Sequence, residues 1–342
     1  MSPPNGTLRV LHVTSSFPRR AGDHQAPYLA DLVAAQRRAG LSPAVLAPHG
    51  PGLASDEVID GVPVHRFRYA PVRGEVLAYR GGLLRTATTP AGALSLPGFI
   101  AAFAAATARA TRRHRADVVH AHWWLPAGLA ALAAQAATRV PYVVTAHGSD
   151  VHLAARPGLA GLARTVWRRA AGLAAVSEAM AAEVGRLAPG LNVEVARMPV
   201  PEPSLPPVDQ PPAPPVRLVA AGRFMPEKGL DVAIDAVTRL VARGTEVRLL
   251  IMGDGPLARD LTLLAGAAHG AVDVVGPGSR QGLWDAIDAS HALVVPSRRE
   301  GLGLIALDAF LRGRPVIASA VGGLTETVGA ADGALVPPDD PA

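Results

Sequence analysis

The 342-residue sequence carries a formal net charge of +5 and contains no cysteine. The length favours two domains with a core each, and the absence of thiols excludes a disulfide framework and cysteine chemistry. Residues 1–6 do not resemble a signal peptide, and no run of about 20 strongly apolar residues is present. We therefore expect a cytoplasmic protein without a membrane-spanning helix.

Short apolar runs alternate with helical patterns along the first part of the chain. Strands are predicted over residues 8–14, 44–47, 62–67, 117–120, 142–145 and 172–176, and helices over residues 27–39, 97–113, 127–137, 160–169 and 178–187. Such alternation is typical of an α/β domain with a doubly wound parallel sheet. We place this domain at residues 1–198.

Nine prolines and little apolar bulk mark residues 199–215 as an extended linker. After the linker the alternation restarts in a second α/β domain, residues 216–342. Strands are predicted there over residues 216–220, 247–252, 272–275, 292–295 and 315–319, and helices over residues 229–243, 256–268, 283–289 and 303–312. Two Rossmann-like domains of this kind are expected to face each other across an active cleft.

The most informative stretch follows the strand at 292–295. Glu300 lies on a turn, Gly301, Leu302 and Gly303 come next, and a helix begins near Leu304. The first N–H groups of a helix have no intrahelical partner and suit a phosphate. A carboxylate beside a phosphate needs a different ligand, and two neighbouring sugar hydroxyls fit Glu300. Asp308, one turn further into the helix, is placed to reach a ribose.

Two other strand ends of the second domain carry candidate phosphate-binding and nucleotide-binding residues. After Gly222, Arg223 offers a guanidinium fork and Lys228, the one lysine of the chain, offers a point charge to phosphate. The spacing is not that of a P-loop, and a solvated turn is the alternative. Residues Gly253, Asp254 and Gly255 end the next strand, where glycines let a nucleotide base approach the backbone, unless they form a plain turn.

In the first domain, His147 and the glycine after it end a strand and are expected to point into the crevice. Asp150 is expected mainly to cap the following turn. His120 and His122 share one face of a strand end; with His147 and Asp150 they could hold a metal, although such histidines more often line a cleft, and we expect no metal. The tryptophans at 123 and 124 are interpreted as core, and Gly22 as an open position on the first strand-to-helix loop.

The two acidic residues Glu300 and Asp308, eight positions apart around a glycine-rich helix start, resemble the Glu-x7-Glu motif of retaining GT-B glycosyltransferases of family 4. The whole chain is similar to that family, although Asp308 stands where the family has Glu. The resemblance implies that Glu300 holds the transferred sugar, Asp308 the ribose, and the Gly301–Leu304 amides the diphosphate.

The resemblance further implies that Arg223 and Lys228 neutralise the departing diphosphate, and that His147 lies beside the transferred sugar. Gly22, His122 and Asp150 would lie on the acceptor side. It also places residues 322–326, Gly-Gly-Leu-Thr-Glu, near the cleft. The donor is then a nucleoside-diphosphate sugar, a substrate rather than a cofactor, and no metal is implied.

The expected acceptor is a glycan, a lipid-linked molecule or a small molecule. Family members usually continue through further helices beyond the point where this sequence stops. A nucleotide-sugar-binding or partner subunit without turnover is therefore an alternative, and an epimerase acting on the donor alone is another.

The charge is uneven, with 21 Arg against 11 acidic residues up to position 198, and 12 basic against 17 acidic residues after it. This suggests an anionic partner for the first domain, or an arginine-rich composition bias. Arg80, Arg85 and the arginines at 109–115, with the apolar residues 99–103, could form a peripheral membrane surface, the alternative being a solvated helix face. Nucleic acid is not expected, because no binding motif accompanies the arginines.

Overall fold

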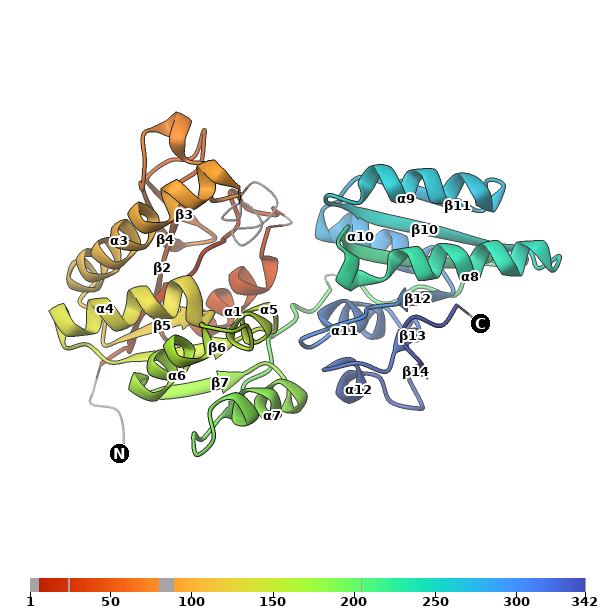
Figure 1. The fold of residues 1–342 in the computed structure, drawn as a ribbon. Coiled ribbons are helices and arrows are strands. Elements are labelled where there is room, and N and C mark those ends of the chain that lie inside the picture. The colour runs from red at the N-terminus through yellow and green to blue at the C-terminus, as the bar shows by residue number, and fades with distance from the viewer. Residues whose placement is uncertain (1–5, 24, 80–88, 204, 342) are drawn as a thin grey trace. The chain divides into compact units, whose positions relative to one another are not determined.

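The computed structural model describes residues 6–23, 25–79, 89–203 and 205–341. The chain divides into two compact units, Met1–Pro199 and Val200–Ala342, each with its own sheet and core (Figure 1). The division falls at the start of the proline-rich segment. The expected fold class, two doubly wound α/β units, is confirmed.

The sheet of the first unit has the strand order β3-β4-β2-β1-β5-β6-β7-β8, and only β3 is antiparallel to its neighbour. Its strands are β1 (Arg9–Val13), β2 (Ser42–Pro48), β3 (Asp56–Ile59), β4 (Val62–Phe67), β5 (Val118–His122), β6 (Tyr142–Ala146), β7 (Gly172–Ala175) and β8 (Glu194–Val195). The sequence did not predict β3 and β8. Both are short edge strands with little burial, so they lack the apolar run by which an inner strand is recognised.

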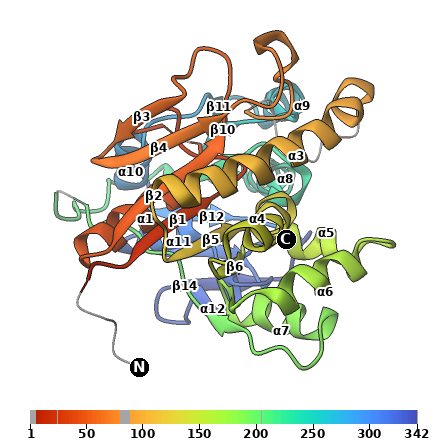
Figure 2. The ribbon, with the colours of Figure 1, turned by 90° about the vertical axis from the view of Figure 1, so that its left-hand side faces the viewer.

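Helices cover both faces of this sheet (Figure 2). They are α1 (Pro27–Arg38), α3 (Pro90–Arg113), α4 (Leu129–Thr138), α5 (Ser149–Ala154), α6 (Ala160–Arg169) and α7 (Glu178–Leu187). Neighbouring residues of β2 show the two faces: Leu46 packs in the core that contains Phe99 of α3, whereas Val45 packs in the core that contains Leu29 of α1. Alternate residues of a strand point to opposite faces, so α1 and α3 lie on opposite sides.

Helix α3 differs from its prediction in two ways. It begins at Pro90 rather than at Pro97, because Thr89 caps it by accepting a hydrogen bond from the Gly92 N–H at 3.1 Å. Phe99 and Phe103 are fully buried in the core. The expectation that residues 99–103 form the apolar part of a membrane surface is therefore wrong for these two aromatic side chains.

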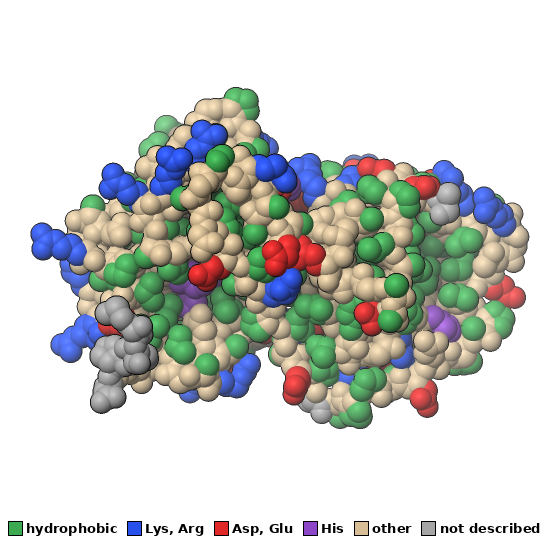
Figure 3. All heavy atoms as spheres, turned by 90° about the horizontal axis from the view of Figure 1, so that it is seen from below, with side chains coloured by type: hydrophobic (Ala, Val, Ile, Leu, Met, Phe, Trp, Pro, Cys, Tyr) green, Lys and Arg blue, Asp and Glu red, His purple; other side chains and the backbone are tan. Residues whose placement is uncertain are grey.

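Among the described helices, α3 is the one whose length and mean hydropathy of 1.6 would allow it to cross a membrane. That test is also passed by core helices, and 33% of the apolar window of α3 is buried inside the protein. Arg80 and Arg85 lie outside the described residues. On the face drawn in Figure 3, basic side chains are scattered among apolar and other atoms rather than merged into one patch.

The second unit has an all-parallel sheet in the order β11-β10-β9-β12-β13-β14. Its strands are β9 (Val216–Arg223), β10 (Val247–Asp254), β11 (Val272–Val275), β12 (Ala292–Val295), β13 (Val316–Ser319) and β14 (Gly333–Val336). Its helices are α8 (Leu230–Ala242), α9 (Ala258–Ala265), α10 (Arg280–Asp288), α11 (Leu304–Leu311) and α12 (Leu324–Thr327). One core joins the sheet to α8 and α9, and the other joins it to α10 and α11.

The winding direction reverses between β1 and β5 in the first unit, and between β9 and β12 in the second. In open α/β sheets, ligands bind outside the carboxyl ends of the strands at such a reversal. The carboxyl ends of β1 and β5 in the first unit, and of β9 and β12 in the second, are therefore the expected ligand-binding positions.

Candidate active site

In the second unit, the reversal brings Lys228 and Glu300 together. Lys228 ends a 3-10 turn, Pro226–Lys228, that follows β9, and Glu300 lies in the loop after β12. The Nζ atom of Lys228 donates to Oε2 of Glu300 at 2.6 Å, and the Ser297 hydroxyl donates to the same oxygen at 3.2 Å. The side chains of Lys228 and Glu300 are 23% and 15% exposed, so a ligand can reach this ion pair.

Arg298, which sequence analysis missed, fastens the Lys228 turn to the Glu300 loop. Its Nη1 donates to the Pro226 carbonyl at 2.7 Å, and its guanidinium binds Asp231 at 2.9 and 2.7 Å. Hydrogen bonding to Asp231 raises the pKa of Arg298 and lowers that of the Asp231 carboxyl. Nothing in the sequence distinguishes Arg298 from the adjacent Arg299, because the contact depends on the pairing of β9 with β12.

The glycines after Glu300 form the start of α11, as predicted. Gly303 has φ of +84° at the N-cap and is buried, and the helix begins at Leu304. A second pair of glycines supports Glu300 from behind: Gly323 N–H donates to the Glu300 carbonyl at 3.2 Å, and a Cβ on Gly322 would lie 2.1 Å from the same oxygen. The segment 322–326 therefore holds the loop that presents Glu300.

The glycines at the ends of β9 and β10 have a packing role. Gly222 and Gly253 are partners in the parallel register, and a Cβ on Gly253 would lie 1.9 Å from the Gly222 carbonyl oxygen. A Cβ on Gly255 would lie 2.5 Å from the Phe224 carbonyl oxygen. Asp254 accepts a hydrogen bond from the Gly255 N–H at 2.7 Å. Gly253 and Gly255 thus need to be glycine for close backbone approach, independently of any nucleotide.

Two other predicted donor residues have different surroundings. Arg223 is 63% exposed at the end of β9, with its Nη2 3.8 Å from Glu227 rather than against Glu300. Asp308 is buried within α11, and its Oδ1 accepts a hydrogen bond from Trp284 Nε1 at 2.8 Å. One oxygen of Asp308 therefore joins α10 to α11, which the sequence did not predict.

In the first unit, the loop after β6 places His147 at the carboxyl edge of the sheet. Asp150 holds this loop, because its Oδ1 accepts from the N–H groups of His147 and Gly148, both at 3.0 Å. Asp150 thus caps the turn as expected, and burial raises its pKa to about 6. The ring of Tyr28 from α1 lies 5.4 Å from that of His147. Gly22, with φ of +73°, is exposed in the loop that leads to α1.

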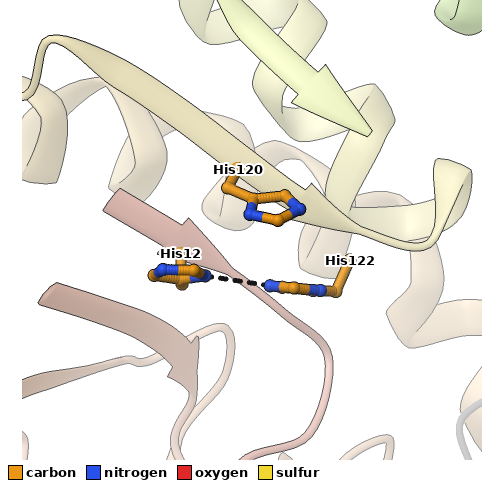
Figure 4. Close-up of side chains that lie close together, drawn as sticks. All are labelled: His12, His120 and His122. Atoms are coloured by element: carbon orange, nitrogen blue, oxygen red, sulfur yellow. Dashed lines mark hydrogen bonds between the residues drawn. The ribbon is translucent and has the colours of Figure 1, made fainter. Parts of the chain in front are cut away.

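Behind His147 lies a cluster of three imidazoles, from His12 on β1 and from His120 and His122 on β5 (Figure 4). One nitrogen atom of each ring lies within 4.8 Å of the others. Burial lowers the pKa of His12 to about 4 and that of His147 to about 3, and it also lowers the pKa values of His120 and His122. His122 is buried, and its Nδ1 lies 3.1 Å from Nε2 of His147.

Neutral imidazoles are suitable ligands for Zn²⁺, but the cluster differs from the metal group considered from the sequence. Asp150 accepts hydrogen bonds from backbone N–H groups and does not belong to the cluster. The third member beside His120 and His122 is His12. The sequence held a weak signal for His12, which lies on the first strand, and only the strand register pairs it with His120. Trp124, next to this strand, is fully buried, which confirms its interpretation as core.

The two doubly wound units, each with polar residues at the carboxyl edge of its sheet, define a GT-B glycosyltransferase fold. Sucrose-phosphate synthase from Thermosynechococcus elongatus superposes with a TM-score of 0.77 at 21% identity, covering 98% of this chain and 87% of that one. The Anabaena HepE structure with UDP and glucose gives 0.69 at 17% identity, over 98% and 87% of the two chains. At these identities the likeness concerns the fold.

The sequence establishes the family. Residues 25–201 match the glycosyl transferase 4-like domain, and residues 215–342 match the glycosyl transferases group 1 model. The chain belongs to this family of glycosyltransferases.

Among its curated relatives is a D-inositol 3-phosphate glycosyltransferase of Xylanimonas cellulosilytica, 32% identical in an alignment 290 residues long that covers 72% of this chain and 66% of the relative. An alpha-D-kanosaminyltransferase of Streptomyces kanamyceticus is 34% identical over 120 residues, 34% of this chain and 31% of the relative. The chain thus spans about two thirds or less of the length of these relatives.

Proposed function

We propose that this protein transfers a sugar from a nucleoside-diphosphate sugar to an acceptor hydroxyl, with retention of the anomeric configuration. The observation that carries the proposal is the accessible Lys228–Glu300 ion pair beside the N-terminus of α11. A cation and the first N–H groups of a helix suit a diphosphate, and a carboxylate suits sugar hydroxyls. Relatives named as sugar transferases, and the HepE complex with UDP and glucose, support this donor class.

In this mechanism the diphosphate accepts hydrogen bonds from the N–H groups of residues 301–304 and attracts the ammonium group of Lys228. Glu300 then gains lone pairs for the hydroxyls of the transferred sugar. As the glycosidic bond breaks, negative charge grows on the leaving phosphate, where Lys228, the exposed Arg223 and the helix N-terminus stabilise it. These positive groups would supply the neutralisation without a metal, and the nucleotide sugar is a substrate, so no cofactor is proposed.

The acceptor is proposed to enter beside His147 and Gly22 of the first unit. No enzyme nucleophile is assigned; the departing phosphate takes the proton of the acceptor hydroxyl on the same face of the sugar. A glycan, a lipid-linked molecule or a small molecule would serve as acceptor in the cytoplasm. A peripheral contact with an anionic membrane would use the arginines near the C-terminal end of α3, without Phe99 and Phe103.

A binding subunit without turnover is the second candidate. The observation that favours it is the hydrogen bond from Trp284 to Asp308, which occupies one oxygen of the carboxylate that the sequence predicts to bind the ribose. This candidate predicts donor binding but no product with any acceptor.

Calorimetric titration with UDP, GDP and ADP tests the donor site. One nucleotide should bind the native chain, and Lys228→Ala should weaken its binding by about 2 kcal/mol, or roughly 30-fold, the scale of a hydrogen bond to a charged group. Glu300→Ala should bind the free nucleotide at least as well, because it removes the carboxylate that competes for Lys228, yet it should lose sugar transfer.

Arg239→Ala is the matched control, since Arg239 makes an exposed ion pair with Asp235 on α8. It should change neither binding nor transfer. A folded native chain that binds none of the three nucleotides, or a Lys228→Ala variant with native affinity, would refute the proposed donor site.

A further inference from the structure

A continuous series of side-chain hydrogen bonds leads from helix α1 to His147. Gln36 Oε1 lies 2.7 Å from Nε2 of His12, and Nδ1 of His12 lies 2.9 Å from Nε2 of His122. Nδ1 of His122 in turn lies 3.1 Å from Nε2 of His147. The contact between His12 and His122 is the dashed line of Figure 4. The four residues come from α1, β1, β5 and the loop after β6.

This series has only two self-consistent arrangements of protons. A neutral imidazole has one N–H and one lone pair, so each ring that receives a hydrogen bond at one nitrogen must donate from the other. The rings are neutral near pH 7, because burial lowers the pKa of His12 to about 4 and that of His147 to about 3. The direction of the first hydrogen bond therefore decides the direction of all the others.

The side chain of Gln36 selects between these arrangements. Its amide oxygen faces His12 and can only accept, so His12 carries its proton on Nε2 and accepts from His122 at Nδ1. His122 then carries its proton on Nε2 and accepts from the Nε2–H of His147 at Nδ1. His147 is left with a lone pair on Nδ1.

We propose that Gln36 is a positioning residue that acts through His12 and His122 to set the tautomer of His147, so that its Nδ1 accepts a hydrogen bond from a ligand hydroxyl. The hydrogen bond that one ring nitrogen makes determines which nitrogen is protonated. The identity of that hydroxyl, on the sugar or on the acceptor, rests on the proposed function. The arrangement of protons in the series does not depend on the proposed function.

Two observations favour a hydrogen-bonded series over a metal centre. The facing nitrogens of His12 and His122 are already 2.9 Å apart, in direct hydrogen-bond contact, and an ion held by both would have to separate them. His120 belongs to the same cluster but turns its Nε2 to the Thr145 hydroxyl at 2.8 Å, outside the series. His120 therefore offers a control within the same group of rings.

The test is two-bond ¹H–¹⁵N NMR of the histidine rings near pH 8, on the whole chain and on two variants of Gln36. The native chain should show His12, His122 and His147 protonated at Nε2. Gln36→Glu retains an acceptor and should keep this pattern. Gln36→Lys presents a donor and should reverse it, with the proton on Nδ1 of all three rings. Gln135→Met, on α4, should leave the pattern unchanged.

A native chain with Nδ1–H rings, a Gln36→Lys variant whose His147 keeps Nε2–H, or a stoichiometric metal bound to the rings of the purified protein would overturn the proposal. If Gln36→Lys unfolds, His12→Phe interrupts the series at similar volume and should leave His147 in a mixture of tautomers, whereas His120→Phe should not. UDP titration of the same samples separates the two proposals, because loss of nucleotide binding concerns the second unit and leaves the ring tautomers as they are.

Discussion

At the scale of the residue, Arg298 acts on the donor site without facing a ligand. Its guanidinium holds the Pro226 carbonyl and Asp231, and so keeps the turn that carries Lys228 against the loop that carries Glu300. Arg298→Ala should weaken binding of the preferred nucleoside diphosphate by about tenfold, corresponding to about 1.4 kcal/mol. Calorimetry checks this. Arg299→Ala, at the exposed neighbouring position, is the control, and equal affinities for the two variants would contradict the positioning role.

Gly253 was interpreted from the sequence as a nucleotide-binding position, but the structure gives it a role in packing. Alanine there would put Cβ against the Gly222 carbonyl and push β9 away from β10. We expect Gly253→Ala to lower the free energy of unfolding by about 1–3 kcal/mol, the usual cost of an overpacked core position. The urea midpoint measures it. Gly266→Ala, with open space around the new methyl group, should stay near the native value.

At the scale of the element, the proline-rich segment is fastened rather than free along part of its length. Arg312 donates to the carbonyls of Leu205 and Pro206 at 2.6 and 2.9 Å, and Arg314 donates to those of Val208 and Asp209, both at 2.9 Å. Both arginines are buried. The expectation of an extended linker therefore needs a correction: residues 205–209 are a strap on the second unit, because buried guanidinium groups require acceptors and the prolines leave carbonyls available.

Removal of Arg314 should release this strap. Arg314→Met keeps apolar volume but leaves the carbonyls of Val208 and Asp209 without their donor, so limited proteolysis at 205–209 with a broad-specificity protease should become several-fold faster. Arg239→Met, at an exposed position, provides the comparison. Cleavage rates that do not differ between the two variants would show that the strap is held by other contacts.

The buried imidazoles of β1, β5 and the loop after β6 make the first unit sensitive to acid. In the unfolded chain histidine protonates near pH 6.5, whereas burial keeps His12 and His147 neutral down to about pH 4 and pH 3. The unfolded state thus binds more protons between these values, so the free energy of unfolding falls as the pH drops from about 6.5 to 4. Asp150, whose pKa burial raises to about 6, opposes this trend and offsets part of it.

Urea midpoints measured near pH 7 and near pH 4.5 check the acid sensitivity. We expect a loss of a few kcal/mol, because each unit of pKa displacement corresponds to about 1.4 kcal/mol. His12→Phe should reduce the loss, and His269→Asn, at an exposed position of the second unit, should not. A midpoint that is independent of pH, or equally dependent in His12→Phe, would contradict the assignment to these rings.

At the scale of the whole molecule, all the proposed diphosphate ligands lie in the unit Val200–Ala342, which has its own sheet and cores. A fragment of residues 200–342 should therefore bind the preferred nucleotide with nearly the affinity of the whole chain. A fragment of residues 216–342 lacks the strap and should be less stable, because Arg312 and Arg314 lose their carbonyl acceptors. Calorimetry and thermal unfolding test both fragments. Binding only by the whole chain would mean that the first unit completes the site.

The α/β class, the restart of the pattern after the prolines, and the strand ends that carry Lys228, Glu300 and His147 could all be predicted from the sequence. These follow from the local periodicity of apolar residues and from glycines at strand-to-helix turns, both of which can be read over a few neighbouring positions. The prediction missed the short edge strands β3, β8 and β14, where the apolar periodicity is weak, and it began α3 at Pro97 although Thr89 caps the helix earlier.

Which of these side chains contact one another became known only from the folded chain. Lys228 and Glu300 are 72 positions apart in the sequence, as are Pro226 and Arg298. His12 and His122 are 110 positions apart. Such contacts depend on the order and register of strands, which bring β12 beside β9 and β5 beside β1. No local pattern encodes that order, so His12, Trp284, Arg298 and the strap at 205–209 became apparent only in the folded chain.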